Sequence, residues 1–257
     1  MYIQELTLET KNNIDKNELV EQFHSLLYVL HKSGQSQSKQ EASFLSDTFI
    51  RCNIQTLEKN SLDNKYNSEW VIKQLEKLES LSSSKLQVKT LGTTYEKYSG
   101  VCQCKNHKFL VLYTHLLNDA GALDCGNCFK PIPLYRFVNL DPIIREHIIS
   151  WEENYIACDR LQIGSTVGEK WATKQMTDYN SPLSKEGIAI CSKIKLLTGI
   201  PTYYYLFNYR RLKVEQDKNR LCPSCSAQWL LDKPLNSLYD FKCDKCELIS
   251  SLTSNSY

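Results

Sequence analysis

Apolar residues follow two different periods in the N-terminal part of the chain. Ile50, Cys52 and Ile54 alternate with polar neighbours, which is the period of a strand with one buried face. Leu19 and Phe23 recur at helical spacing instead, after an aspartate suited to cap a helix. This order is typical of an α+β fold with helices on one side of a small sheet. We predict β-α-β-α-β, with strands at 2–8, 48–56 and 86–90 and helices at 15–34 and 68–81.

Beyond this region the pattern predicts two strands and two helices. A short apolar run at 109–113 is typical of a strand, and so is a strongly aromatic run at 203–209. Asp-Pro at 141–142 and Ser-Pro at 181–182 each place a capping side chain before a proline at the first helical position. The second of these helices is expected to end at Gly199.

Four cysteines in the C-terminal part of the chain form the strongest metal-binding pattern. Their arrangement is C-x2-C-x17-C-x2-C, which lies within the spacing of zinc ribbons. Each C-x2-C pair makes a tight turn that directs two sulfurs to one point, so that two turns complete a tetrahedral shell of thiolates. A closed shell of protein ligands predicts a structural zinc site, whereas two disulfides or four unrelated thiols are the alternatives. The predicted ligands are Cys222, Cys225, Cys243 and Cys246.

A second group of cysteines in the middle of the chain predicts a second zinc site. Its C-x2-C half is an ordinary knuckle, but its first half allows two ligand sets. Cys104 and His107 would form a C-x2-H pair and repeat the 17-residue gap of the C-terminal pattern. We favour the all-cysteine set because a thiolate is the stronger zinc ligand; a cluster of free thiols is the alternative. The favoured ligands are Cys102, Cys104, Cys125 and Cys128.

The other three cysteines are expected in the core, and redox activity is not expected of the central pair. Cys52, Cys158 and Cys191 lie on apolar faces of predicted elements, so we interpret them as small core residues. A C-x2-C pair can also be redox-active, but that chemistry requires the pair to open a helix. Pro131 and Pro133 follow the central pair and disfavour such a helix.

Composition narrows the compartment and the class of partner. The formal net charge is +2, so the whole surface is not built to attract polyanions. The sequence shows neither a signal peptide nor an apolar run long enough to span a membrane. Eleven cysteines in such a chain favour reduced thiols and metal in the cytoplasm, with no membrane partner.

The pattern as a whole predicts an α+β protein: a small mixed sheet with packed helices, a central Cys-rich zinc knuckle region and a C-terminal zinc ribbon. We predict an α+β domain at 1–97, the knuckle region at 98–136, a helical segment with the aromatic strand at 137–211 and the ribbon at 212–257.

Several blocks of the sequence together carry a family resemblance. The blocks are CGNCF at 125–129 followed by PLYR at 133–136, SPLSKEG at 181–187, TGIPTYYY at 198–205 and FKCDKC at 241–246. Through them the chain resembles an uncharacterised bacterial family of zinc-ribbon-containing proteins, a domain of unknown function for which nucleic-acid binding has been suggested. The resemblance implies zinc and a binding role, and it implies no catalytic residues.

Basic residues near the aromatic strand give the nucleic-acid hypothesis its candidate site. Aromatic rings beside cations can stack bases and neutralise phosphates, whereas the simpler interpretation is a core strand next to a solvated turn. Tyr203 and Tyr205 lie on one face of the predicted strand. The candidate nucleic-acid-binding residues are Arg210, Arg211, Lys213, Lys218 and Arg220.

The sequence contains no phosphate-binding loop, dinucleotide fingerprint or nucleophile elbow, so we expect no enzymatic activity. Two binding roles remain. The first is binding of RNA or single-stranded nucleic acid, and the second is binding of a protein, for example as an immunity protein against a toxin or as an adaptor. For the second role, Trp171 and Tyr179 are the candidate anchors, in an expected connection between two helices.

Overall fold

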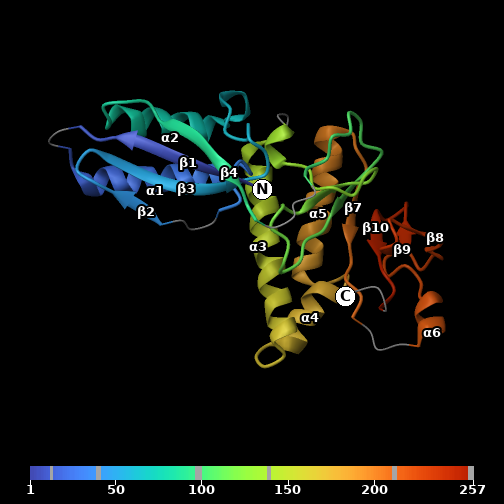
Figure 1. The fold of residues 1–257 in the computed structure, drawn as a ribbon. Helices are drawn as coiled ribbons and strands as arrows, with labels where there is room; N and C mark the ends of the chain where they lie inside the picture. Colours follow the sequence, from blue (N-terminus) through green and yellow to red (C-terminus); the bar gives the residue numbers. More distant parts are fainter. Residues whose placement is uncertain (12–13, 39–41, 96–99, 138–139, 210–212, 254–257) are drawn as a thin grey trace. The chain divides into compact units, whose positions relative to one another are not determined.

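The computed structural model describes the whole chain except residues 12–13, 39–41, 96–99, 138–139, 210–212 and 254–257. The described residues form two compact units, each with its own sheet and helices (Figure 1). The division into four segments stays a prediction from the sequence. The first unit holds Met1–Val101, Asp119–Gly121 and Lys130–Glu146, and the second holds Cys102–Asn118, Ala122–Phe129 and His147–Tyr257.

The first unit is built on a four-stranded antiparallel sheet in the order β2-β3-β1-β4. Its elements follow the chain as βαββαβ, the order of the ferredoxin-like fold. The sequence pattern predicts all of them except β2, whose three residues are too few to show a period. The bounds are β1 Tyr2–Glu9, α1 Lys16–Lys32, β2 Ser43–Leu45, β3 Phe49–Thr56, η1 Asn64–Tyr66 (a 3-10 turn), α2 Glu69–Ser80 and β4 Gln87–Thr93.

Local signals set the ends of both helices of this unit. The Asp15 carboxylate accepts a hydrogen bond from the Asn17 amide at 2.8 Å and so caps α1. The Ser68 hydroxyl caps α2 in the same way, through the amide of Val71. After α1 the chain turns at Gly34, whose φ of +79° is the left-handed conformation that glycine adopts at low cost.

The core of the first unit lies between its two helices and one face of the sheet. Alternate residues of β1 and β3 point into it, so Leu6 and Ile50 are buried while Asn53 is exposed. Phe23 of α1 and Leu78 of α2 belong to the same apolar cluster. Both helices therefore cover one face of this sheet, as the sequence predicts (Figure 1).

The last segment of the first unit carries the 3-10 turn η2 (Leu134–Arg136). The Tyr135 hydroxyl lies 2.8 Å from the Ser61 hydroxyl and donates to the Glu58 carboxylate at 2.8 Å. Arg136 forms an ion pair with the same carboxylate. These buried polar contacts attach the segment to the loop that follows β3, far away in the sequence.

The second unit contains a six-stranded mixed sheet in the order β6-β5-β7-β10-β9-β8. The central strand β7 runs parallel to β5 on one side and to β10 on the other, and β5 and β10 each pair antiparallel with the next strand. The sequence predicts β5 and β7, but β7 ends earlier than expected and β6 is not predicted. The bounds are β5 Leu110–Leu112, β6 Leu123–Cys125, β7 Thr202–Tyr205, β8 Leu230–Leu235, β9 Tyr239–Cys243 and β10 Leu248–Ser250.

Helix α5 of the second unit begins and ends at the residues that the sequence marks. The Ser181 hydroxyl accepts from the Ser184 amide at 3.0 Å to cap α5, and Gly199 ends that helix with a φ of +72°. The prediction of an irregular connection before α5 is wrong for part of its length, because α4 occupies it. The bounds are α3 Pro142–Gly164 (which begins in the first unit), α4 Glu169–Thr177, α5 Pro182–Thr198 and α6 Val214–Lys218.

Strand β7 is buried on both faces. Tyr204 points to the helices, where its ring packs against Gly187 of α5 and lies 6.0 Å from the Trp151 ring of α3. On the other face Tyr203 and Tyr205 belong to a separate aromatic cluster and are at most 5% exposed. The interpretation of the aromatic run as a core strand therefore holds for Tyr203–Tyr205, whereas Phe207 and Tyr209 lie beyond the strand and are half-buried.

The protein is α+β, as predicted, with small sheets, packed helices and two groups of four cysteines. One group lies in the middle of the chain and the other towards its C-terminal end. Within the part of the chain that the structure describes, every helix is too short or too polar to cross a bilayer.

Candidate metal centres

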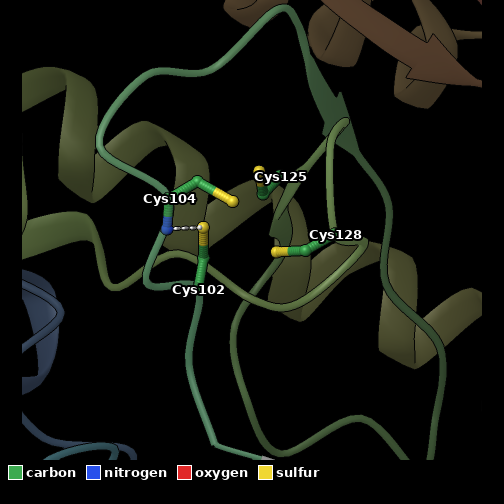
Figure 2. Close-up of side chains that lie close together, drawn as sticks. All are labelled: Cys102, Cys104, Cys125 and Cys128. Carbon is green, nitrogen blue, oxygen red and sulfur yellow. Dashed lines mark hydrogen bonds between the residues drawn. The ribbon is translucent and has the colours of Figure 1, made fainter.

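The central cysteine group closes around a single point in the second unit. The sulfurs of its four residues all lie within 4.8 Å of one another and face a common centre (Figure 2). Two come from the segment before β5, and two from the knuckle that begins at the end of β6. In the sheet Cys125 pairs with Leu110 of β5, so strand pairing fixes where the knuckle starts. The four residues are Cys102, Cys104, Cys125 and Cys128.

The C-x2-C half of this group has the backbone of a tight knuckle. The Asn127 amide donates to the Cys125 sulfur at 3.4 Å, and the Phe129 amide donates to the Cys125 carbonyl at 2.7 Å. Phe129 has a φ of +53°, which reverses the chain. A Cβ at Gly126 would lie 2.4 Å from the Phe109 ring, so only glycine fits in the knuckle at this position.

The Asn127 side chain holds the two halves of the central group together. Its Oδ1 accepts from the Lys108 amide at 3.0 Å, and its Nδ2 donates to the Asn106 carbonyl at 2.8 Å. The knuckle is thereby bound to the turn that follows Cys104. In the first half, the Cys104 amide donates to the Cys102 sulfur at 3.3 Å (Figure 2). The role of Asn127 is not among the sequence predictions, and its only signal there is its place between two ligand cysteines.

His107 lies beside the central group without being one of its four mutually close ligands. Its Nδ1 is 3.3 Å from the Cys125 sulfur and 4.0 Å from the Cys102 sulfur. In this position the ring can donate a hydrogen bond to the Cys125 thiolate when Nδ1 carries the proton. The geometry therefore favours the set of four cysteines as ligands, and His107 contacts two of them.

The C-terminal group repeats this arrangement at the other side of the same sheet. Its sulfurs lie within 4.8 Å of one another, and those of Cys225 and Cys243 are 3.7 Å apart. Ser226 and Glu247 each follow the second cysteine of a knuckle, with φ values of +58° and +52°. Phe129 stands at the same place in the central knuckle, so all three C-x2-C pairs turn alike. The four residues are Cys222, Cys225, Cys243 and Cys246.

Hydrogen bonds from backbone amides lower the pKa of these thiols, whereas burial raises it. A hydrogen bond from the Ala227 amide, helped by neighbouring thiols, lowers the pKa of Cys225 to about 7. Burial raises the pKa of Cys243 to about 12 and that of Cys102 still further. At neutral pH, a thiol with a raised pKa loses its proton when a cation binds beside it. Metal binding and deprotonation at these positions are therefore coupled.

The donor sets fit a tetrahedral, thiolate-binding metal. Four sulfurs from paired knuckles are the ligands of closed structural zinc sites, and amide donors to sulfur are the usual surroundings of such thiolates. The disulfide alternative is not realised, since all eleven cysteines are described and all are free. Cys52, Cys158 and Cys191 are buried in the apolar interior, as the sequence indicates.

The candidate nucleic-acid-binding residues that the structure describes, Lys213, Lys218 and Arg220, differ in their surroundings. Arg210 and Arg211 lie outside the described residues, and Lys213 is exposed. Lys218 pairs with Glu215 at 3.0 Å. Arg220 is the most enclosed of the set: its guanidinium pairs with buried Asp217 at 3.1 Å and lies 4.0 Å from the centre of the Phe241 ring. This side chain therefore has a role in packing the ribbon.

The two candidate anchors for a protein partner differ in their surroundings. Trp171 lies on α4 and is 58% exposed, an unusual position for so large an apolar ring. Tyr179 follows α4 and is half-buried. Trp171 is therefore not buried between helices and remains available to a partner.

Three family models, all described as domains of unknown function, match the chain: DUF8589 at residues 1–92, DUF2310 at 104–207 and DUF8594 at 211–256. Two curated proteins of Haemophilus influenzae, both named only as uncharacterised, are similar over 145 residues, or 56% of this chain. One is 41% identical with 71% of its length covered, and the other is 40% identical with 56% covered. The match therefore spans little more than half the length of the second relative. The chain belongs to the family of the first of these Haemophilus proteins, an uncharacterised family.

Proposed function

We propose that this protein is a non-enzymatic binding protein whose second unit is stabilised by two structural zinc ions. The observation that carries the proposal is the convergence of two sets of four cysteine sulfurs, each set within 4.8 Å, on one sheet. Four thiolates fill a tetrahedral shell and leave no position for water or substrate. The metals would therefore supply folding free energy rather than catalysis.

Zinc is the metal that this arrangement favours. A tetrahedral set of four thiolates suits zinc and also iron, and it excludes the hard cations that prefer oxygen. Zinc also has no redox chemistry, as expected for a structural metal whose four protein ligands leave no position for a substrate. The free thiols also suit a reducing compartment, so we place the protein in the cytoplasm.

Elemental analysis of paired variants tests the two sites separately. The purified chain should hold two zinc ions, and Cys222→Ser/Cys243→Ser and Cys102→Ser/Cys125→Ser should each lose one. Cys52→Ala is the matched control, because this thiol is buried in the first unit and belongs to neither group. Retention of both zinc ions in either double variant would contradict the assignment of that site.

The ligand set of the central site has its own test. Cys102→Ala should remove the central metal, because Cys102 supplies one of the four mutually close sulfurs. His107→Ala should leave the metal content unchanged and only accelerate its removal by a chelator, because a hydrogen bond to a ligand supports affinity without forming the metal bond. The reverse result, with metal lost only from the histidine variant, would establish Cys104 and His107 as the ligands.

The partner that we favour is a protein. Base stacking on Tyr203 or Tyr205 would require opening the core, because both rings are at most 5% exposed. A formal net charge of +2 also gives little drive towards phosphate. In contrast, Trp171 is 58% exposed, and tryptophan is among the side chains that dominate binding energy at protein interfaces. A toxin neutralised by an immunity protein, or a target of an adaptor, fits this role.

Nucleic-acid binding is the second candidate, favoured by the exposed Lys213 and by the suggestion attached to the family that the sequence resembles. Capture of partners from lysate, with and without nuclease, separates the two roles. A protein complex should survive nuclease and moderate salt, whereas binding to nucleic acid weakens as salt rises, with a slope of about 0.7–0.9 for each phosphate that the protein neutralises. Loss of all capture after nuclease, and in a variant neutralised at the basic positions other than the packed Arg220, would favour nucleic acid and reject the protein role.

A further inference from the structure

The second unit has a cavity of about 480 Å³, partly open to solvent, that the metal sites do not use. It lies where β5 ends and runs along the C-terminal half of α3. Tyr113, Tyr155, Tyr205 and Phe207 supply aromatic walls, and Asp159 supplies a carboxylate. A volume of roughly 300–1,000 Å³ with mostly apolar walls and a few polar groups is typical of small-molecule sites.

Three polar side chains of α3 line this cavity and can form further hydrogen bonds there. The Asp159 side chain is 9% exposed, and its Oδ2 accepts from the Leu116 amide at 2.7 Å. Gln162 and Tyr155 are also buried, with 6% and 2% of their surface exposed. Within the described part of the chain, no hydrogen bond is formed by Asp159 Oδ1, by the Gln162 side-chain amide or by the Tyr155 hydroxyl. None of these atoms is among the sealed, unpaired polar atoms of the described residues, so all three are open to the cavity and can pair with a molecule bound there.

Asp159 supplies the negative charge at the cavity, and His115 is the one basic side chain among the described residues that line it. Neither lysine nor arginine is among these lining residues. The aromatic walls add to this field because the faces of phenol rings carry negative potential. The Tyr113 ring lies 4.3 Å from that of Tyr205 and 6.5 Å from that of Tyr155, so the rings form a continuous wall. Burial also raises the pKa of the Tyr113 hydroxyl, which keeps this donor neutral and protonated.

The mouth of the cavity is apolar. Leu117 is 81% exposed and Ile163 is 58% exposed, and both line the cavity. An anionic ligand would be repelled by the carboxylate, and a bare metal cation would leave the apolar mouth unused. A cation with an apolar portion uses both features.

We propose that this cavity binds an organic amine, with its ammonium group paired to Asp159 and hydrogen-bonded to Gln162 and Tyr155. Its apolar stem lies along the aromatic wall and leaves through the mouth between Leu117 and Ile163. A free amine and a lysine side chain of a partner present the same chemistry. This site is independent of the metal sites and of the proposed binding role.

Binding of three isosteric probes to the zinc-loaded full chain tests the proposal. Phenethylamine carries the cation, 2-phenylethanol is its neutral analogue and phenylacetate is its anionic analogue; titration followed by NMR or calorimetry gives each affinity. The amine should bind about tenfold or more tightly than the alcohol, because a charge-assisted hydrogen bond is stronger than a neutral one, and phenylacetate should not bind. Equal affinity of the amine and the alcohol, or no binding of the amine at millimolar concentration, would overturn the proposal.

Variants locate the site. Asp159→Asn keeps an oxygen acceptor for the Leu116 amide and should lose about tenfold or more in amine affinity. The exposed helix residue Glu186 provides the control, since Glu186→Gln removes an equal charge elsewhere in the unit and should bind as the wild type does. Unchanged affinity in Asp159→Asn would overturn the assignment. The comparison of probes uses wild-type protein, so it decides the question even if that variant does not fold.

A blocked lysine separates the two sources of the ammonium group. Nα-acetyl-lysine methylamide binding more tightly than phenethylamine would assign the cavity to a lysine side chain of a partner. The opposite order would assign it to a free aryl amine. Both results support an amine site, and the absence of binding by both probes would overturn it.

Discussion

Replacement of Gly126 by alanine tests whether packing inside the central knuckle controls metal binding. The new Cβ would lie 2.4–2.5 Å from the Cδ2, Cε2 and Cγ atoms of Phe109. Carbon atoms pack at about 3.5–4.0 Å, so the ring or the knuckle has to retreat by about 1 Å. The ring is held edge-on by Tyr203 at 5.3 Å and by Phe129 at 6.3 Å, which leaves the knuckle as the part that yields. Overpacking of this kind costs about 1–3 kcal/mol.

The assay combines metal content with thermal unfolding. The melting transition of the second unit should fall by about 2–4 °C for each kcal/mol of destabilisation, and the central zinc should be removed faster by a chelator. Gly92→Ala is the matched control, because a Cβ there meets nothing within 4 Å and its backbone is not left-handed. The double variant Phe109→Ala/Gly126→Ala should regain metal retention, because the clash is gone. A Gly126→Ala protein that melts and holds both metals like the wild type would refute the reasoning.

Three further substitutions have defined outcomes. Gly187→Ala should destabilise the protein by about 1–3 kcal/mol in thermal melting, although alanine normally favours a helix by about 1 kcal/mol, since its Cβ would lie 2.3 Å from the Tyr204 ring. Arg220→Ala should cost about 3 kcal/mol in denaturant unfolding because it leaves the Asp217 carboxylate, 1% exposed, without its cation; a loss below about 0.5 kcal/mol would show that the pair contributes little. Trp171→Ala should abolish partner capture and change stability by less than about 0.5 kcal/mol, whereas a large fall in melting temperature would mean that this exposed ring is structural.

Local chemistry in the sequence fixes the helix ends and the metal ligands. Asp15, Ser68 and Ser181 cap the helices that the sequence predicts, because a cap depends on a few consecutive residues. The C-x2-C pairs are equally local, since a knuckle turns within five residues. The spacing therefore identifies the three C-x2-C pairs, whereas the choice of Cys102 and Cys104 over Cys104 and His107 depended on the stronger zinc binding of a thiolate.

Short strands are where the sequence pattern fails. The strands β2 (Ser43–Leu45) and β6 (Leu123–Cys125) have three residues each, which is less than two full periods of alternation. Each forms because a neighbouring strand offers a pairing edge, and that edge exists only in the folded chain. The helix α4 (Glu169–Thr177) is missed for a related reason: its exposed Trp171 and polar residues give a weak apolar stripe.

By itself, the sequence determined the fold class, the helix caps and the two groups of thiol ligands, because each depends on residues close together in the chain. Only the tertiary structure decided which of the competing interpretations holds for distant residues. It buries Tyr203 and Tyr205 between layers and places His107 beside the Cys125 sulfur. It also brings Asp159 of α3 to the aromatic end of β5 and β7, and this creates the amine cavity. These outcomes depend on contacts between segments separated by many residues, and periodicity and spacing carry no information about such contacts.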